Sequence, residues 1–346
     1  MGGCEFYEAG DGNIRRERKE KMVNETKIAV VGAGTMGPGI AQTYAVAGYE
    51  VWLYSRTEKT LKRAKDIIFS SLQFLENEGR IENGKAAAER VHYTTDLACA
   101  VQDAWYVVES ISERPDDKQK LYEKLNDMLP KGTIISSNTS YMDIFELMPP
   151  VRQPHAVIVH WIAPPQLLPL VEAVRGPQTT QEVINAMMQL HKACQKTPIL
   201  IERYIPGFII NRLQSAMTRE VVYLIENGYC TKEDVDLAVK TSLMPRGMLL
   251  GVIQRMDFGG LDVAADGLEN KQYIPAPAPD HPSLIFSPCG RGDLGVKTGR
   301  GIYDYTHQSY AEVIRHRDQQ LLQSVRLAEN FLKDPLHRST CARLKD

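Results

Sequence analysis

The chain has 346 residues, of which 43% are hydrophobic and 24% charged, and its formal net charge is −2. This composition is typical of a globular protein with about two domains, and the small net charge gives no reason to expect a nucleic acid partner. No apolar run approaches the ~18 residues that a membrane-spanning helix needs. The six cysteines are scattered without a C-x-x-C pair, which favours reduced thiols over disulfides or a metal site. Together with the lack of an apolar signal-peptide core, this favours a cytoplasmic protein.

The first predicted elements surround a glycine-rich turn. Residues 28–31 form a short apolar run typical of a buried strand, GAGTMG follows directly, and helical spacing then leads to a second strand at 51–54. In G-x-G-x-x-G the first glycine makes a tight turn, the second lets a pyrophosphate approach, and the third lets the helix pack on the strand. The free N–H groups at the helix start bind the anion. The unit therefore predicts a dinucleotide site rather than an ordinary glycine-rich turn, and its predicted cofactor-binding residues are Gly32, Gly34, Thr35, Met36 and Gly37.

The end of the second strand indicates which dinucleotide binds. NAD enzymes usually carry an acidic residue there, which holds the ribose 2′-hydroxyl, whereas this chain has Ser55 followed by Arg56. A serine and an arginine accept a 2′-phosphate, which an acid would repel. We therefore predict that Ser55 and Arg56 bind the cofactor and favour NADP, with NAD held by weaker contacts as the alternative.

Strands and helices continue to alternate until about residue 200, which predicts an α/β Rossmann domain with a doubly wound parallel sheet. A long amphipathic helix is expected at 58–78, and further strands are expected at 91–94, 104–108, 133–136 and 156–160. From Pro206 onward the pattern is helical, with long helices at 208–227 and 309–332 and a proline-rich irregular segment at 272–289. The predicted parts are a charged N-terminal extension at 1–25, a dinucleotide-binding domain at 26–204, an all-helical substrate and dimerisation domain at 205–332, and a tail at 333–346.

One histidine stands where acid–base chemistry is expected. His160 ends a predicted strand above the dinucleotide site, and Glu172 follows 12 residues later. A histidine can take a hydroxyl proton while hydride leaves the same carbon, and a carboxylate partner orients the ring and stabilises the imidazolium. A structural histidine is the alternative, but the position and the downstream carboxylate favour a general base.

The chain resembles the 3-hydroxyacyl-CoA dehydrogenase family, which includes the lambda-crystallin-like sugar-acid dehydrogenases. The matching stretches are GAGTMGPGIA, YVVESISER, SSNTS, HWIAPPQLLPLVEAV, PGFIINRL and LGVKTGRGIYDY, and they span residues 27 to about 305 in the family's order. The resemblance implies that His160 is the general base, that Glu172 orients it, and that the protein is a homodimer. It also implies that Ser137 and Asn211 lie close to the substrate oxygen. Further residues expected at the cofactor are Glu109, Glu113 and Asn138.

Two departures from the family's pattern concern the substrate and the cofactor. Family members usually carry Asn-Pro where this chain has Ala163-Pro164, and Ser55 replaces an acidic residue. No concentrated lysine patch suits the phosphates of coenzyme A. The first hypothesis is an NAD(P)-dependent dehydrogenase of a 3-hydroxy acid or its CoA thioester. The alternatives are a dehydrogenase of a free sugar acid or other small hydroxy acid, and a non-catalytic dinucleotide-binding protein.

Overall fold

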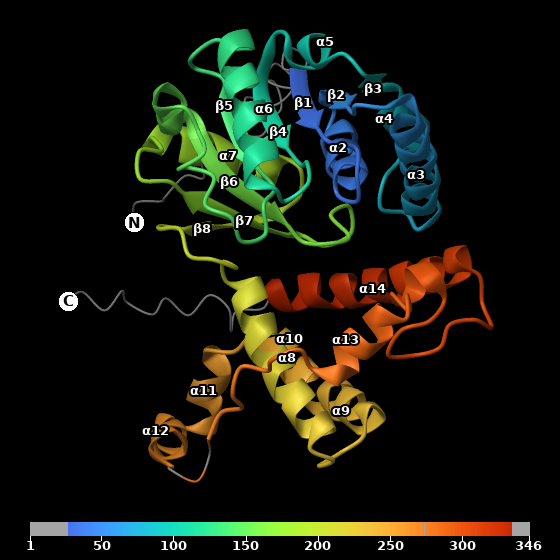
Figure 1. The fold of residues 1–346 in the computed structure, drawn as a ribbon, viewed down its shortest axis with the longest axis vertical. Coiled ribbons are helices and arrows are strands. Elements are labelled where there is room, and N and C mark those ends of the chain that lie inside the picture. The colour runs from blue at the N-terminus through green and yellow to red at the C-terminus, as the bar shows by residue number, and fades with distance from the viewer. Residues whose placement is uncertain (1–26, 271, 273, 334–346) are drawn as a thin grey trace, which may run out of the picture. The chain divides into compact units, whose positions relative to one another are not determined.

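A computed structural model describes residues 27–270, 272 and 274–333 of the chain (Figure 1). Cα proximity divides the chain into two compact units, with the boundary between Ile209 and Ile210. The predicted N-terminal extension at 1–25 lies outside the described residues, and so does the predicted tail apart from Lys333. The two units are described separately below.

Unit 1 is built on one eight-stranded sheet in the order β3-β2-β1-β4-β5-β6-β7-β8. The strands are β1 (Lys27–Val31), β2 (Glu50–Tyr54), β3 (Val91–Thr94), β4 (Ala104–Glu109), β5 (Ile134–Ser137), β6 (Ala156–Trp161), β7 (Leu170–Arg175) and β8 (Thr197–Ile201). All neighbouring pairs are parallel except β6 and β7, which are antiparallel. The predicted Rossmann fold is thus confirmed, but β7 and β8 were not predicted. The prolines before β7, its buried glutamate and the proline in β8 all weaken a strand pattern in the sequence.

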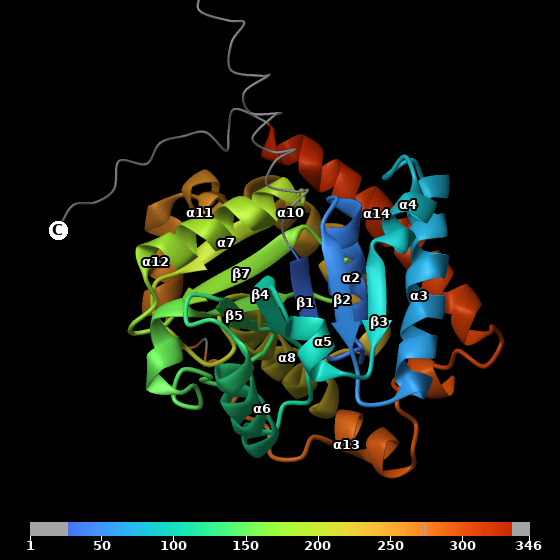
Figure 2. The ribbon, with the colours of Figure 1, turned by 90° about the horizontal axis from the view of Figure 1, so that it is seen from above.

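Helices cover both faces of this sheet. They are α2 (Gly37–Val46), α3 (Glu58–Asn77), α4 (Gly84–Glu89), α5 (Leu97–Val101), α6 (Pro115–Met128) and α7 (Gln181–Ala193), with a 3₁₀ segment η1 (Pro150–His155) before β6. Side chains of a strand alternate between its faces, so Ile28 and Val30 of β1 pack in the cluster that contains Tyr44 of α2. The side chain of Ala29 lies on the opposite face of the sheet and packs in the cluster that contains Tyr122 of α6. Helices α6 and α7 accordingly lie on opposite sides of the sheet (Figure 2).

Unit 2 is helical, as predicted. Its helices are α8 (Ile210–Glu226), α9 (Lys232–Ala238), the π-helical η2 (Val239–Leu243), α10 (Met244–Leu250), α11 (Gln254–Gly259), α12 (Leu261–Glu269), α13 (Ser283–Gly290), the 3₁₀ segment η3 (Val296–Thr298) and α14 (Tyr310–Leu332). The prediction of an irregular segment at 272–289 is wrong for its second half, which forms α13. Pro282 stands at the N-cap of α13, where a missing N–H breaks no helical hydrogen bond. None of the helices in the described ranges is long and apolar enough to cross a membrane.

Candidate active site

The turn between β1 and α2 needs glycine at two positions. Gly32 has a φ of +119°, and a Cβ there would lie 2.3 Å from the carbonyl oxygen of Ser110. A Cβ on Gly37 would lie 1.8 Å from the carbonyl oxygen of Gly32. Around Gly34, by contrast, no atom lies within 4 Å of the position of a Cβ, so a ligand can approach the backbone. These three environments fit the separate roles of the glycines in a dinucleotide-binding turn.

The start of α2 offers free donors next to this turn. Its N-cap residue Met36 makes no side-chain hydrogen bond to the first turn, and Pro38 stands in that turn. Gly34 and Thr35 are exposed. Because the first N–H groups of a helix lack intrahelical partners, the exposed turn fits the phosphates of a dinucleotide.

The end of β2 lies beside the same turn. The Gly32 N–H donates to the carbonyl oxygen of Tyr54 at 2.9 Å, and the Ser55 N–H donates to that of Thr94 at 3.3 Å. Ser55 is half-buried and Arg56 is exposed. Both residues predicted to select the cofactor therefore follow directly on the strand that touches the glycine turn.

A buried cluster surrounds the carboxylate of Glu109 at the end of β4. Its Oε1 accepts from Lys118 Nζ at 2.7 Å and from the Ile111 N–H at 2.8 Å. Its Oε2 accepts from the hydroxyls of Tyr122 at 2.7 Å and Ser137 at 2.6 Å. Burial, reinforced by the carboxylate, raises the pKa of Tyr122 well above its usual value, so this hydroxyl stays a donor. Glu109 is fully buried and has its donors within the protein, so its predicted place at the cofactor stays a prediction.

Ser137 belongs to this cluster. It is fully buried, donates to Glu109, and accepts the Thr139 N–H at 3.2 Å. In the loop that follows β5, Ser140 is half-buried, and its N–H donates to Oε1 of Glu113 at 2.7 Å. The contact of Ser137 with a substrate oxygen stays a prediction, and Ser140 is the more exposed hydroxyl of the two.

Asn138 joins three strand ends. Its Nδ2 donates to Ser110 Oγ at 3.4 Å, after β4, and its Oδ1 accepts the N–H of Trp161 at 2.9 Å, at the end of β6. The side chain therefore ties the loop after β5 to both neighbouring strands. Its predicted contact with the cofactor stays a prediction.

His160 and Glu172 face each other across the antiparallel pair β6–β7. Nδ1 of His160 lies 2.7 Å from Oε2 of Glu172, and the two residues are 4% and 0% exposed. Because a carboxylate oxygen only accepts, Nδ1 donates to it, and in the neutral imidazole Nε2 is then the acceptor nitrogen. Oε1 of Glu172 accepts the Ile209 N–H at 2.9 Å, and the ring of Phe208 lies 5.2 Å from the imidazole ring. This arrangement orients an imidazole nitrogen that can accept a proton when the ring is neutral.

The loop between β6 and β7 is held from two sides. Lys196 Nζ donates to the carbonyl oxygens of Pro165 at 2.6 Å and Leu168 at 3.0 Å, and burial lowers the pKa of Lys196 to about 8. On the other side, a Cβ on Gly39 of α2 would lie 2.6 Å from Cγ of Pro165. Ala163, where the family usually has asparagine, is exposed in this loop.

Lys118 and Lys196 were not singled out by the sequence analysis. No local signal distinguishes a buried lysine in an amphipathic helix, or at a strand start, from a solvated one. Asn211 lies in the first turn of α8, in unit 2, and its role stays a prediction.

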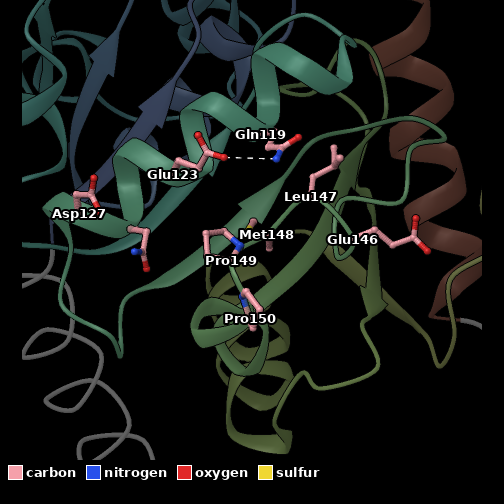
Figure 3. Close-up of a pocket in the computed structure, with 9 residues that line it drawn as sticks. Gln119, Glu123, Asp127, Glu146, Leu147, Met148, Pro149 and Pro150 are labelled. Carbon is pink, nitrogen blue, oxygen red and sulfur yellow. Dashed lines mark hydrogen bonds between the residues drawn. The ribbon is translucent and has the colours of Figure 1, made fainter.

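A separate cavity of about 600 Å³ lies between α6 and the segment before η1 (Figure 3). Its lining includes Glu123, Asp127 and Glu146, and Gln119 donates to Glu123 at 3.4 Å. No predicted site residue lines it, and its acidic wall does not suit a dinucleotide phosphate. Within the described residues no group of three or more His, Cys, Asp or Glu side chains could hold a metal ion.

Comparison with known proteins decides the family. Residues 27–204 match the family described as "3-hydroxyacyl-CoA dehydrogenase, NAD binding domain", and residues 207–305 match "3-hydroxyacyl-CoA dehydrogenase, C-terminal domain". The chain belongs to the 3-hydroxyacyl-CoA dehydrogenase family. It is 34% identical over 299 residues to the mitochondrial hydroxyacyl-coenzyme A dehydrogenase of Sus scrofa, covering 82% of this chain and 93% of the relative.

The chain is also similar to enzymes named for a pyridine carboxylate. The 5-formyl-3-hydroxy-2-methylpyridine 4-carboxylate 5-dehydrogenase of Mesorhizobium japonicum is 27% identical over 303 residues, covering 87% of this chain and 98% of the relative. The crystal structure of a 5-dehydrogenase of that pyridine acid, described as an NAD⁺-dependent dismutase, has a TM-score of 0.79 at 26% identity. The match covers 88% of this chain and 98% of the chain in that structure. The protein is thus an oxidoreductase that acts on a CH–OH group with a nicotinamide dinucleotide.

Proposed function

We propose that the protein interconverts a 3-hydroxy acid or 3-hydroxyacyl-CoA and its 3-keto form, with His160 as the general base and Glu172 as its orienting partner. The observation that carries this proposal is the buried contact of 2.7 Å between His160 Nδ1 and Glu172 Oε2. It leaves Nε2 free to accept the proton of a substrate hydroxyl.

His160 and Glu172 carry out the transfer of the substrate hydroxyl proton. In oxidation Nε2 takes the hydroxyl proton, and the carboxylate of Glu172 stabilises the imidazolium that results. In reduction the same Nε2–H returns the proton to the alkoxide oxygen. A bound dinucleotide would supply the hydride chemistry, as the hydride acceptor in oxidation and the hydride donor in reduction.

The test of the base is His160→Ala. General acid–base groups contribute about 10²–10⁴ in rate, so turnover should be lost while the glycine turn still binds the dinucleotide. The matched control is His92→Ala, because His92 also contacts a glutamate, Glu50, at 2.7 Å, but on the surface. A His160→Ala protein with near wild-type kcat would remove the assignment, and so would an equal loss in both variants.

The second candidate substrate is a small free hydroxy acid, such as a sugar acid. Two observations support it: Ala163 stands in place of asparagine, and a similar structure belongs to an enzyme named for a pyridine carboxylate rather than a CoA thioester. Matched pairs such as 3-hydroxybutyryl-CoA and 3-hydroxybutyrate separate the two substrates. A higher kcat/KM for the thioester supports the first, and a higher value for the free acid supports the second.

A dinucleotide-binding protein without turnover is the remaining alternative. The buried His160–Glu172 pair argues against it. Burial of a carboxylate costs free energy, and buried ionisable groups held beside a specific partner cluster at functional sites. Turnover with any of these free hydroxy acids or their CoA thioesters excludes this alternative.

We propose NADP as the favoured cofactor, with NAD as the alternative. Exposed Arg56 can meet the 2′-phosphate with a fork of donors, and Ser55 brings no repulsion. A hydrogen bond to a charged group is worth about 1.5–3 kcal/mol, roughly ten- to hundredfold in affinity. Fluorescence titration should show tighter NADPH than NADH binding in the wild type and the reverse in Ser55→Asp. Tighter NADH binding in the wild type, unchanged by Ser55→Asp, contradicts the proposal.

We also propose a cytoplasmic homodimer that forms through unit 2. Helices α11 and α12 expose a set of large apolar side chains: Phe258, Leu261, Val263 and Leu268. Contiguous exposed apolar patches are typical of protein–protein interfaces, and these side chains come from two consecutive helices. Analytical ultracentrifugation should give a dimer, and Leu261→Asp combined with Leu268→Asp should give a monomer.

A further inference from the structure

The last turn of unit 1 contains a residue in a rare conformation. Gly207 has a φ of 79°, and Phe208 has a φ of 52°. The Phe208 N–H donates to the carbonyl oxygen of Ile205 at 3.0 Å, which closes the turn. A left-handed conformation costs a side-chain-bearing residue roughly 1–2 kcal/mol, so it persists only where the surroundings hold it.

The Phe208 side chain is fixed against the imidazole. It is 1% exposed, and its ring centroid lies 5.2 Å from that of His160 at an interplanar angle of 55°. Tyr204 supports it from another side, with ring centroids 6.3 Å apart. Ring pairs with centroids about 4.5–7 Å apart attract each other, so the Phe208 ring favours one orientation of the imidazole ring.

The next residue along the chain contacts the other member of the pair. The Ile209 N–H donates to Oε1 of Glu172 at 2.9 Å, while Oε2 of the same carboxylate accepts from His160. The left-handed residue Phe208 immediately precedes this N–H in the chain. Consecutive residues of one turn therefore hold the imidazole ring and its carboxylate partner.

We propose that Phe208 is a positioning residue for the His160–Glu172 pair. Its ring holds the imidazole plane, and its backbone delivers the Ile209 N–H that fixes the carboxylate. The consequence for turnover rests on the proposed role of His160 as the base. The geometric part does not, because the contacts exist without substrate.

The test compares Phe208→Ala with Phe208→Leu, which keeps most of the buried volume. Displacing a catalytic group by about 1 Å costs up to ~10²-fold, so we expect Phe208→Ala to lower kcat about ten- to hundredfold and Phe208→Leu about three- to tenfold. The cofactor Kd should stay within about twofold, because the rings that Phe208 contacts, His160 and Tyr204, are not residues of the glycine turn.

A readout that needs no substrate is the proton NMR signal of the His160 Nδ1–H. Held by a buried carboxylate, this proton should give a low-field signal in the wild type that broadens by solvent exchange in Phe208→Ala. The matched control is Phe145→Ala, which removes another ring from the same core cluster as Phe208. The control should lose stability to a similar degree but keep the signal and kcat.

Each outcome decides the proposal. Wild-type kcat together with a sharp Nδ1–H signal in Phe208→Ala overturns it, as does an equal loss of both in Phe145→Ala. If Phe208→Ala does not fold, Phe208→Leu decides in the same way. If His160→Ala proves active, the base assignment fails, and the NMR signal alone still tests whether Phe208 positions the pair.

Discussion

Replacing Glu172 by glutamine is the sharpest test of how the His160–Glu172 pair works. The substitution keeps the size and shape of the side chain but turns one acceptor oxygen into an NH₂ donor. The Ile209 N–H, which donates to Oε1 at 2.9 Å, is a backbone group that can only donate. The amide oxygen must therefore face Ile209, which turns the NH₂ group toward His160 Nδ1.

This orientation reverses the tautomer of the imidazole. Nδ1 must become the acceptor, so Nε2 takes the proton and can no longer act as the base. Loss of the charged hydrogen bond costs about 1.5–3 kcal/mol, or roughly ten- to hundredfold in rate. A wrong tautomer alone can cost about 10⁴-fold in a comparable acid-to-amide change. We expect kcat of Glu172→Gln to fall by about 10²–10⁴-fold.

The assay is steady-state turnover at saturating dinucleotide, together with ¹⁵N NMR of His160, which distinguishes the two tautomers. The control is Glu202→Gln, the same chemical change at an exposed residue that pairs with Arg175. It should leave kcat within about twofold, since exposed pairs contribute little. Near wild-type kcat in Glu172→Gln, or an unchanged Nδ1–H tautomer, would refute the reasoning.

Three further predictions concern stability and packing. Lys118→Met leaves the buried Glu109 carboxylate without its cation and should lower the free energy of unfolding in urea by about 3–5 kcal/mol, with partial recovery on adding Glu109→Gln. Burial lowers the pKa of His191 to about 4, so its neutral form stabilises the fold above pH ~6.5, and this contribution is lost as the pH falls toward 4. Between pH 7 and pH 5 it should amount to about 2 kcal/mol, and His191→Gln should lack this part of the pH dependence in urea titrations. Gly39→Ala should push Pro165 away from α2 and lower kcat without loss of cofactor binding, whereas wild-type kcat would show that the loop adapts freely.

Local pattern was enough for much of unit 1. The spacing of apolar residues over short stretches predicts the glycine turn, the strands on either side of it and the alternation that follows. The structure contains β1 before this turn and α2 and β2 after it. The helical character of unit 2 was also readable, because amphipathic spacing and a start such as Ser309-x-x-Glu312 are local features. The helix α13 escaped prediction because prolines at 282 and 288 suggested a loop.

The sequence by itself thus determined the Rossmann architecture, the place of the dinucleotide turn and the residue types available at the strand ends. Only the tertiary structure decided which of these residues meet. The register of antiparallel strands β6 and β7 brings His160 opposite Glu172, although β7 carried no strand pattern of its own. Likewise, Ser137 and Lys118 both donate to the buried carboxylate of Glu109, so Ser137 lies in a buried cluster. Ser140 is the more exposed hydroxyl of the two serines. Strand register and burial depend on contacts between residues far apart in the chain, and a local pattern does not contain them.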